Sequence, residues 1–195
     1  MTAAGRLNSK VAIVTGGGGG FGSGIVQKFV QEGAKVVVVD IQPSIAATVA
    51  RVFPSTQVVA VQADVSSEAD WGRVLKYTID TFQHLDVVVN NAGVNPGAYT
   101  TISTPEDGYD RMMRINLKAL YYSTKVAIPY FLDKQREGVF VTVSSISASR
   151  PRPGAVWYAA SKAALTTASK GLALEWAANG LRFNVVQPVL GDTPM

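Results

Sequence analysis

Short apolar runs alternate along the chain with longer stretches in which apolar side chains recur every three or four residues. The short runs are almost continuously apolar, which is typical of parallel strands covered by helices on both faces. The longer stretches have the period of amphipathic helices. Strands are predicted at residues 11–15, 35–40, 57–63, 85–90, 138–144 and 182–187, and helices at residues 22–32, 44–51, 68–83, 106–134 with a break near Asn116, and 157–179.

This alternation predicts an α/β fold with one doubly wound parallel sheet of about six strands, three layers and right-handed crossovers. The chain has 195 residues, of which 47% are hydrophobic and 16% charged, and this is enough for a sizeable core. No internal repeat or linker interrupts the pattern. Residues 1–195 are therefore predicted to form a single domain.

The composition excludes several classes of partner. The net charge of +4 is spread along the chain without a basic block, so no nucleic-acid partner is expected. The nearest basic cluster, Arg150-Pro-Arg152-Pro, is interpreted as a loop, with a role toward a charged substrate as the alternative. With no cysteine and a single histidine, His84, neither disulfides nor a metal site is expected.

The N-terminal residues lack the apolar segment of a secretion signal, and no apolar run reaches the length of a membrane span. A cytoplasmic protein without a membrane partner is therefore expected.

A glycine-rich turn follows the first predicted strand. Glycines let the backbone turn tightly and approach a pyrophosphate, and the N-terminus of the next helix supplies N–H donors and positive dipole. A poly-glycine turn can also be a plain loop, but its place between strand and helix favours phosphate binding. The residues of this turn are Gly16, Gly18, Gly19, Gly20, Phe21 and Gly22.

Asp40 ends the second predicted strand, about twenty residues after the glycine turn, where a carboxylate accepts hydrogen bonds from an adenosine ribose. Its charge would repel a 2′-phosphate, and no basic residue lies in the turn, so NAD(H) is favoured over NADP(H). Asp40 and the adjoining Ile41 are therefore candidate cofactor contacts. The alternative is that Asp40 caps the loop or helix near Ser44.

Tyr158 and Lys162 are four residues apart in a predicted helix and so lie on one face, one turn apart. A fixed ammonium beside a phenol favours the phenolate and brings proton transfer into range at neutral pH. Ser145 follows the fifth predicted strand and places a hydroxyl near this pair. An amphipathic helix pair without chemistry is the alternative for an isolated Tyr-x-x-x-Lys motif.

Together the motifs resemble those of the short-chain dehydrogenase/reductase family in its single-domain, Rossmann-like form, over essentially the whole chain. Thr15-Gly16-x-x-x-Gly20-Phe21-Gly22 resembles the family's glycine turn, with Phe21 where isoleucine or leucine is more usual. The other matching motifs are Asp64-Val65, which resembles the pair that holds the adenine, Asn90-Asn91-Ala92-Gly93 after the fourth strand, and Asn116, Ser145, Tyr158 and Lys162 at the four catalytic positions.

The resemblance implies an NAD(H)-dependent oxidoreductase that interconverts a secondary alcohol and a ketone. Tyr158 would exchange a proton with the substrate oxygen, and Ser145 would donate a hydrogen bond to it. Lys162 would lower the tyrosine pKa and hold the nicotinamide ribose, and Asn116 would anchor a water between Lys162 and solvent. The further cofactor contacts implied are Asp64, Val65, Asn91, Ala92, Gly93, Pro188 and Thr193.

The chain departs from the family pattern after Pro188, where Val189 replaces the usual glycine, and Leu190 or Gly191 is expected to take over the main-chain contacts. Family members continue into a substrate loop, further helices and a seventh strand, and this sequence ends before them. The sixth strand is therefore expected to be a sheet edge. The alternative function is an NAD-binding protein with little or no turnover, because the substrate lid is missing.

The resemblance also implies a dimer that pairs two long helices around the active site, here residues 114–134 and 157–179. Both helices carry more small and apolar residues than one sheet-facing stripe needs, which favours a second buried face. The alternative is that their alanines only reflect helix propensity. A homodimer through these helices and a small-molecule alcohol or ketone as substrate are the expected partners.

Overall fold

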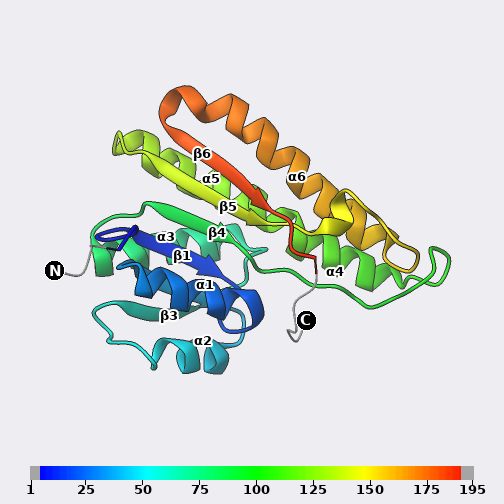
Figure 1. Cartoon of the computed structure of the whole chain (residues 1–195), viewed down its shortest axis with the longest axis horizontal. Coiled ribbons are helices and arrows are strands. Elements are labelled where there is room, and N and C mark those ends of the chain that lie inside the picture. The colour runs from blue at the N-terminus through cyan, green and yellow to red at the C-terminus, as the bar shows by residue number, and fades with distance from the viewer. Residues whose placement is uncertain (1–4, 190–195) are drawn as a thin grey trace.

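The computed structural model describes residues 5–189 and contains one parallel sheet with helices on both faces (Figure 1). The sheet has six strands in the order β3-β2-β1-β4-β5-β6, and every neighbouring pair is parallel. The predicted fold class is therefore confirmed. The strands are β1 (Val11–Thr15), β2 (Lys35–Asp40), β3 (Val58–Gln62), β4 (Val87–Asn90), β5 (Gly138–Val143) and β6 (Leu181–Val186).

The helices follow the predicted positions to within about two residues at most ends, with short 3₁₀ turns after β5 and after the last helix. The predicted break near Asn116 is present, because α4 ends at that residue and α5 begins at Lys118. The helices are α1 (Gly20–Gln31), α2 (Pro43–Ala50), α3 (Glu68–Phe82), α4 (Glu106–Asn116), α5 (Lys118–Asp133) and α6 (Val156–Trp176), with 3₁₀ turns η1 (Ile146–Ala148) and η2 (Ala177–Asn179).

Two apolar clusters form the core, one on each face of the sheet. On one face, side chains of β1, β2 and β4 pack against α1 and α2, with Val26 and Ala46 at the centre of the helix contacts. On the other face, α3, α5 and α6 cover the sheet, and Phe131 of α5 stacks edge-on against Phe140 of β5. Because both faces are covered, the central strands are apolar at almost every position, as the sequence pattern predicted.

Polar contacts around Asp86, just before β4, connect the amino ends of neighbouring strands. Asp86 is buried, and its carboxylate accepts a hydrogen bond from the Val11 backbone N–H at 2.8 Å. Arg136 donates to the same carboxylate at 3.1 Å, and His84 lies 3.1 Å from it. These contacts join the starts of β1, β4 and β5, and they account for His84 without any catalytic role.

Among the helices of residues 5–189, none combines the length and the apolar character that a membrane crossing requires.

Candidate active site

The strand order reverses between β1 and β4, and ligands of open α/β sheets bind outside the carboxyl ends of the strands at such a point. Thr15, the last residue of β1, fixes the two strand ends relative to each other. Its hydroxyl donates to the Val89 carbonyl at 3.1 Å and accepts from the backbone N–H groups of Asn91 at 3.0 Å and Ala92 at 3.1 Å. The Asn91 side chain donates to the carbonyls of Thr15 and Gly16 at 2.9 and 3.1 Å. Asn91 therefore fastens the glycine turn to the end of β4.

The glycine turn leads directly into α1. Gly16 has a φ of +59°, a left-handed conformation that favours glycine, and Gly22 packs so closely on the Gly16 carbonyl that a Cβ would collide with it. Gly19 is the N-cap of α1. The positive end of the helix dipole thus faces the switch point, and the first turn of α1 contains neither an acidic residue nor a side-chain cap. This arrangement fits the pyrophosphate of a dinucleotide.

Asp40 lies against the glycine turn, as the sequence predicted. One carboxylate oxygen accepts a hydrogen bond from the Gly18 N–H at 3.2 Å, and the other accepts from the Gln42 N–H at 3.1 Å. The N-cap of α2 is Gln42 and it has no side-chain cap, so Asp40 supports the loop but does not cap the helix. Ile41, beside it, is 57% exposed. Both residues are placed where they could meet an adenosine ribose, and this contact stays a prediction.

Asp64 and Val65 lie just beyond the carboxyl end of β3, and both already have partners. The Asp64 carboxylate accepts from the Ser66 N–H at 2.8 Å and the Ser66 hydroxyl at 2.6 Å, and the Val65 carbonyl accepts from the Trp71 indole at 3.0 Å. The Asp64 N–H also donates to Asp70, which lowers the pKa of the Asp70 carboxyl. These contacts fix the loop, and the adenine contact inferred from the resemblance stays a prediction.

Lys162 is a buried cation in the second turn of α6, one turn after Tyr158. Its side-chain Nζ donates to the Val143 carbonyl at 3.0 Å and lies 5.8 Å from the centre of the Tyr158 ring. Among residues 5–189 no carboxylate lies within ion-pair distance of it. Burial therefore lowers the pKa of Lys162 from 10.5 to about 8.

Polar contacts between β5 and α6 hold Lys162 in place. The Ser144 hydroxyl donates to the Lys162 carbonyl at 2.8 Å and lies 3.0 Å from the Thr166 hydroxyl. Further along the helix, Ser169 donates to the Thr142 hydroxyl at 3.1 Å. The small hydroxyl residues of α6 therefore fix its register against the strand, and with it the height of Tyr158 and Lys162.

The pKa of Tyr158 departs from the expectation. Burial raises it above the ordinary 10.0, while the Ser145 hydroxyl, which can donate to the phenolate, and the charge of Arg152 act in the opposite direction. The prediction that Lys162 lowers this pKa is therefore not met. Burial is the largest influence on this pKa, and the Lys162 ammonium, which lies over the ring 5.8 Å from its centre, donates to the Val143 carbonyl.

Asn116 closes the site from α4. Its side-chain carbonyl accepts from the Val94 N–H at 2.8 Å, and its amide donates to the Val94 carbonyl and to the Ser161 hydroxyl, both at 3.0 Å. Ser161 in turn donates to the Tyr158 carbonyl at 2.7 Å. Asn116 thus joins the segment after β4 to α6. Its proposed water contact is not addressed by these bonds.

Gly93 lies between the side chains of Lys162 and Asn116. A Cβ at this position would lie 3.1 Å from the Lys162 Nζ and 3.3 Å from the Asn116 carbonyl oxygen. The side chains of Lys162 and Asn116 therefore meet at Gly93, although they are far apart in the sequence. Ser145 is the N-cap of η1, where its hydroxyl accepts from the Ser147 N–H at 3.1 Å.

Two predicted cofactor contacts lie at the end of the described chain. The Pro188 carbonyl accepts from the Ile146 N–H at 2.9 Å, which places it beside η1 and the candidate residue Ser145. Thr193 lies outside the described residues, as do Leu190 and Gly191. Val189 is 72% exposed.

Sequence reasoning missed the residues that support the site. Ser144 and Ser161 make the hydrogen bonds that place Lys162 and Tyr158. Asn90, which the sequence placed in a motif without assigning it a role, is buried at the end of β4, and its amide nitrogen and oxygen have no hydrogen-bond partner within the part of the chain that is described. A hydroxyl or amide in an otherwise apolar segment next to a motif is the only signal that could have identified them.

Comparison with known proteins agrees with this geometry. The sequence profile of the family described as short chain dehydrogenase matches residues 10–195. The 4-formylbenzenesulfonate dehydrogenase of Comamonas testosteroni is 42% identical over 192 residues, which cover 97% of this chain and 76% of that protein. The L-fucose dehydrogenase of Bos taurus is 37% identical over 190 residues, which cover 97% and 69% of the two chains.

Solved structures show the same likeness. The 3-ketoacyl-(acyl-carrier-protein) reductase of Brucella melitensis, complexed with NADH, superimposes with a TM-score of 0.94 at 36% identity, covering 97% of this chain and 79% of that one. The chain therefore belongs to the short-chain dehydrogenase family. The predictions of an oxidoreductase acting on CH–OH groups and of NAD(H) as its cofactor are confirmed.

Proposed function

We propose that this protein interconverts a secondary alcohol and a ketone with NAD(H), using Tyr158, Ser145, Lys162 and Asn116. The observation that carries the proposal is the convergence of Lys162 and Asn116 on Gly93, with Tyr158 one helical turn away. These residues come from α4, α6 and the segments after β4 and β5. A buried lysine without an ion-pair partner is not required by packing, which favours a functional role. The relatives' names cover an aromatic sulfonate and a sugar, so membership of the family does not fix the substrate.

The bound cofactor supplies the hydride acceptor in alcohol oxidation and the hydride donor in ketone reduction. Tyr158 takes the hydroxyl proton of the alcohol in one direction and returns it to the carbonyl oxygen in the other. Ser145 donates a hydrogen bond to the same oxygen, where negative charge develops. Because burial raises the pKa of Tyr158, the phenol is protonated at neutral pH and is ready to act as an acid. Oxidation needs the phenolate, so it should become faster as the pH rises.

Lys162 and Asn116 prepare the site for the proton and the cofactor. The ammonium of Lys162 has two protons that are not used by the Val143 carbonyl, and these can bind ribose hydroxyl groups. Asn116 keeps the segment after β4 against α6, and we infer that it also positions the water through which the proton leaves. The glycine turn and Asp40 would hold the pyrophosphate and the adenosine ribose.

Replacing Asp40 with alanine is expected to weaken the preference for NAD(H). The carboxylate stands beside the Gly18 N–H, where the additional phosphate of NADP(H) would be repelled. Its removal should raise the affinity for NADPH and lower that for NADH, each by roughly tenfold, because a hydrogen bond to a charged group is worth about 1.5–3 kcal/mol. Calorimetric titration with both reduced cofactors measures the ratio.

The matched control is Asp80→Ala, which removes an exposed carboxylate of α3 at the Lys76 ion pair. It should leave the ratio unchanged. NADPH affinity equal to or better than NADH affinity in the unmodified protein would contradict the role of Asp40.

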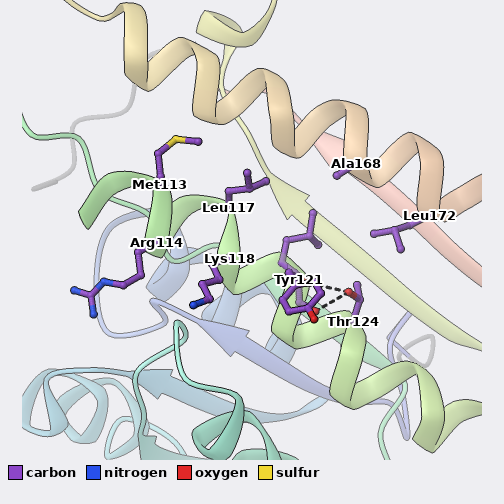
Figure 2. A pocket seen from close by; sticks show the side chains of 9 residues that line it. Met113, Arg114, Leu117, Lys118, Tyr121, Thr124, Ala168 and Leu172 are labelled. Atoms are coloured by element: carbon purple, nitrogen blue, oxygen red, sulfur yellow. Dashed lines mark hydrogen bonds between the residues drawn. The ribbon is translucent and has the colours of Figure 1, made fainter. Parts of the chain in front are cut away.

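We further propose that the protein forms a homodimer through α4, α5 and α6. A groove of about 520 Å³ runs between these helices on the outer surface, away from Tyr158. Figure 2 shows Met113 and Leu117 directed toward α6, whose Ala168 and Leu172 form the opposite wall, while Arg114 and Lys118 extend away from it. An apolar groove with a charged rim is typical of a protein interface. A two-fold axis beside it would bury the same helices of both copies.

Sedimentation at micromolar concentration is expected to give a dimer, and Ala168→Arg should give a monomer. The added guanidinium would enter the groove beside Arg114 and Lys118, where a second copy brings further positive charge. Gln31→Arg adds the same charge on α1, on the other face of the sheet, and should remain dimeric. A clean monomer or a stable tetramer of the unmodified protein would exclude this interface.

A further inference from the structure

The loop between η1 and α6, which leads directly to Tyr158, carries two arginines. Arg150 and Arg152 are both exposed, and each is followed by a proline. The backbone of the loop is ordered by hydrogen bonds from the Arg150 N–H to the Ile146 carbonyl at 2.9 Å and from the Ala155 N–H to the Arg152 carbonyl at 3.3 Å. The prolines reduce the freedom of the chain on either side of Arg152. The two guanidinium groups are therefore presented from a stiff segment.

A second loop, which follows β4, contacts this one. The Tyr99 N–H donates to the Gly154 carbonyl at 3.1 Å, and Ala98 lies against Gly154. This contact joins the segment after β4 to the segment before α6. Arg152 thus stands where the two loops meet, two residues from Gly154 and six from Tyr158.

Arg152 also lies within electrostatic reach of the reacting phenol. Its charge lowers the pKa of Tyr158, in opposition to burial. A cation that influences the phenol will also attract an anion bound next to the phenol.

The two loops contain no carboxylate, and the nearest acidic side chains along the chain are Glu106 and Asp107 in the first turn of α4, which packs on Trp157 through Tyr109. Residues 138–174 include Arg150, Arg152, Lys162 and Lys170 but no aspartate or glutamate, and residues 91–105 contain no charged residue. Within residues 5–189, neither Arg150 nor Arg152 forms an ion pair or a side-chain hydrogen bond. The guanidinium donors of Arg150 and Arg152 are therefore available to a ligand.

We propose that the substrate carries an organic oxyanion, a carboxylate or a sulfonate, which Arg152 binds while the reacting oxygen lies at Tyr158 and Ser145. A guanidinium presents paired N–H donors that match the geometry of such a group. Arg150, on the same loop, adds to the positive charge. This inference rests on the proposed alcohol–ketone chemistry and defines the substrate class of the same site.

A charge series of 1-phenylethanols substituted at the para position tests the proposal. The neutral member carries methyl, the anionic members carry carboxylate or sulfonate, and the cationic member carries trimethylammonium. We expect kcat/KM with NAD+ to be roughly ten- to a hundredfold higher for an anionic member than for the neutral one, from one charge-assisted hydrogen-bonded pair. The cationic member should be the poorest substrate, and the preference should shrink as salt is added.

Arg152→Gln is expected to reduce the ratio of kcat/KM between anionic and neutral members to near one, mainly through KM. Loss of its charge also alters the Tyr158 pKa, but that change affects every member of the series equally and cancels in the ratio. Arg182→Gln is the control. It removes an exposed guanidinium near the amino end of β6, whereas the site lies at the carboxyl ends of the strands. This variant should keep the ratio of the unmodified protein.

Equal kcat/KM across the series, or a ratio that Arg152→Gln leaves unchanged, overturns the anion proposal while the alcohol–ketone chemistry stands. Absence of NADH formation with every member contradicts the chemistry instead. Calorimetry with 4-acetylbenzoate and 4-methylacetophenone in the presence of NADH then decides the anion question. Tighter binding of 4-acetylbenzoate than of 4-methylacetophenone, with this preference lost in Arg152→Gln, supports the proposal. Equal binding of the two ketones overturns it.

Discussion

Replacing Tyr158 with phenylalanine is expected to lower kcat by a factor of about 10²–10⁴, the usual contribution of a positioned acid–base group. The substitution removes the phenol oxygen and keeps the ring, whose centre lies 5.8 Å from the Lys162 Nζ. Within the described residues the phenol makes no hydrogen bond that the fold needs. Steady-state kinetics in both directions measures the loss, and NADH affinity should change little.

The pH profile separates this role from a structural one. In the unmodified protein, alcohol oxidation should accelerate as the pH rises, because burial raises the pKa of Tyr158 and the phenolate becomes available only in alkaline solution. The Tyr158→Phe variant should lose that acceleration together with its activity. An unchanged thermal unfolding midpoint serves as the control for folding. Activity within a few-fold of the unmodified protein would exclude Tyr158 as the proton carrier.

Replacing Lys162 with methionine is expected to stabilise the fold at pH 7 while it weakens NAD(H) binding and catalysis. The folded-state pKa of Lys162 is about 8 against 10.5 for the free side chain, so the folded protein holds the charged amine at a cost. Each pKa unit corresponds to about 1.4 kcal/mol, which makes that cost roughly 3 kcal/mol at pH 7. Methionine removes the cost but leaves the Val143 carbonyl without its donor, about 1 kcal/mol in the other direction.

The sign of the pH dependence follows from the lowered pKa. Below pH 8 the lysine is charged in both the folded and the unfolded chain, and the full cost is present. Between pH 8 and 10.5 the unfolded chain binds more protons, so the free energy of unfolding of the unmodified protein rises with pH. The advantage of Lys162→Met should therefore shrink by about 2 kcal/mol between pH 7 and pH 9.5.

Urea unfolding at these two pH values measures the difference. Lys170→Met, which removes an exposed lysine from the same helix, is the matched control and should show no such change. A variant at Lys162 that is less stable than the unmodified protein by the same amount at both pH values would mean that the amine is not strained by burial.

The sheet and its helices could be predicted because each strand is buried on both faces and each helix on one. Continuous apolar runs such as Val36 to Val39 leave no doubt about a parallel strand, and the break at Asn116 interrupts a helical pattern that is otherwise unbroken. The sequence pattern predicted parallel strands with right-handed crossovers, whereas the order β3-β2-β1-β4-β5-β6 came from the structure alone. Strand ends were misplaced by one or two residues, as at β4, where Asp86 belongs to the polar contacts before the strand.

The candidate catalytic residues could be proposed from the sequence because they lie in short motifs, but their electrostatic surroundings could not be predicted. The i, i+4 spacing of Tyr158 and Lys162 indicated one helix face, and it suggested an ammonium acting directly on the phenol. The tertiary structure supplies the Val143 carbonyl as a nearer partner and a buried environment that shifts both pKa values in the direction of the neutral form. The positive charge that lowers the pKa of Tyr158 is that of Arg152, in the loop before α6, whereas this effect was expected from Lys162. Such contacts depend on side-chain directions that sequence spacing does not specify.

The hydroxyl groups that support the site could not be predicted either, because their contacts also depend on side-chain directions. Ser144, Ser161 and Ser169 lie among apolar residues and carry no motif of their own, yet they fix α6 against β5 and α4. Their positions become meaningful only once the helix and strand are seen together.

Transfer of deuterium from the carbinol carbon of a labelled secondary alcohol to NAD+ tests the central claim most directly. The protein is mixed with NAD+ and deuterated 4-(1-hydroxyethyl)benzoate or its neutral 4-methyl analogue, and the products are analysed by mass spectrometry. The proposal predicts one deuterium in each NADH formed, one ketone for each NADH, and loss of both products in Tyr158→Phe. Tight NAD+ binding by a folded protein that transfers no deuterium from any secondary alcohol would contradict it, and would indicate a nucleotide-binding protein without turnover.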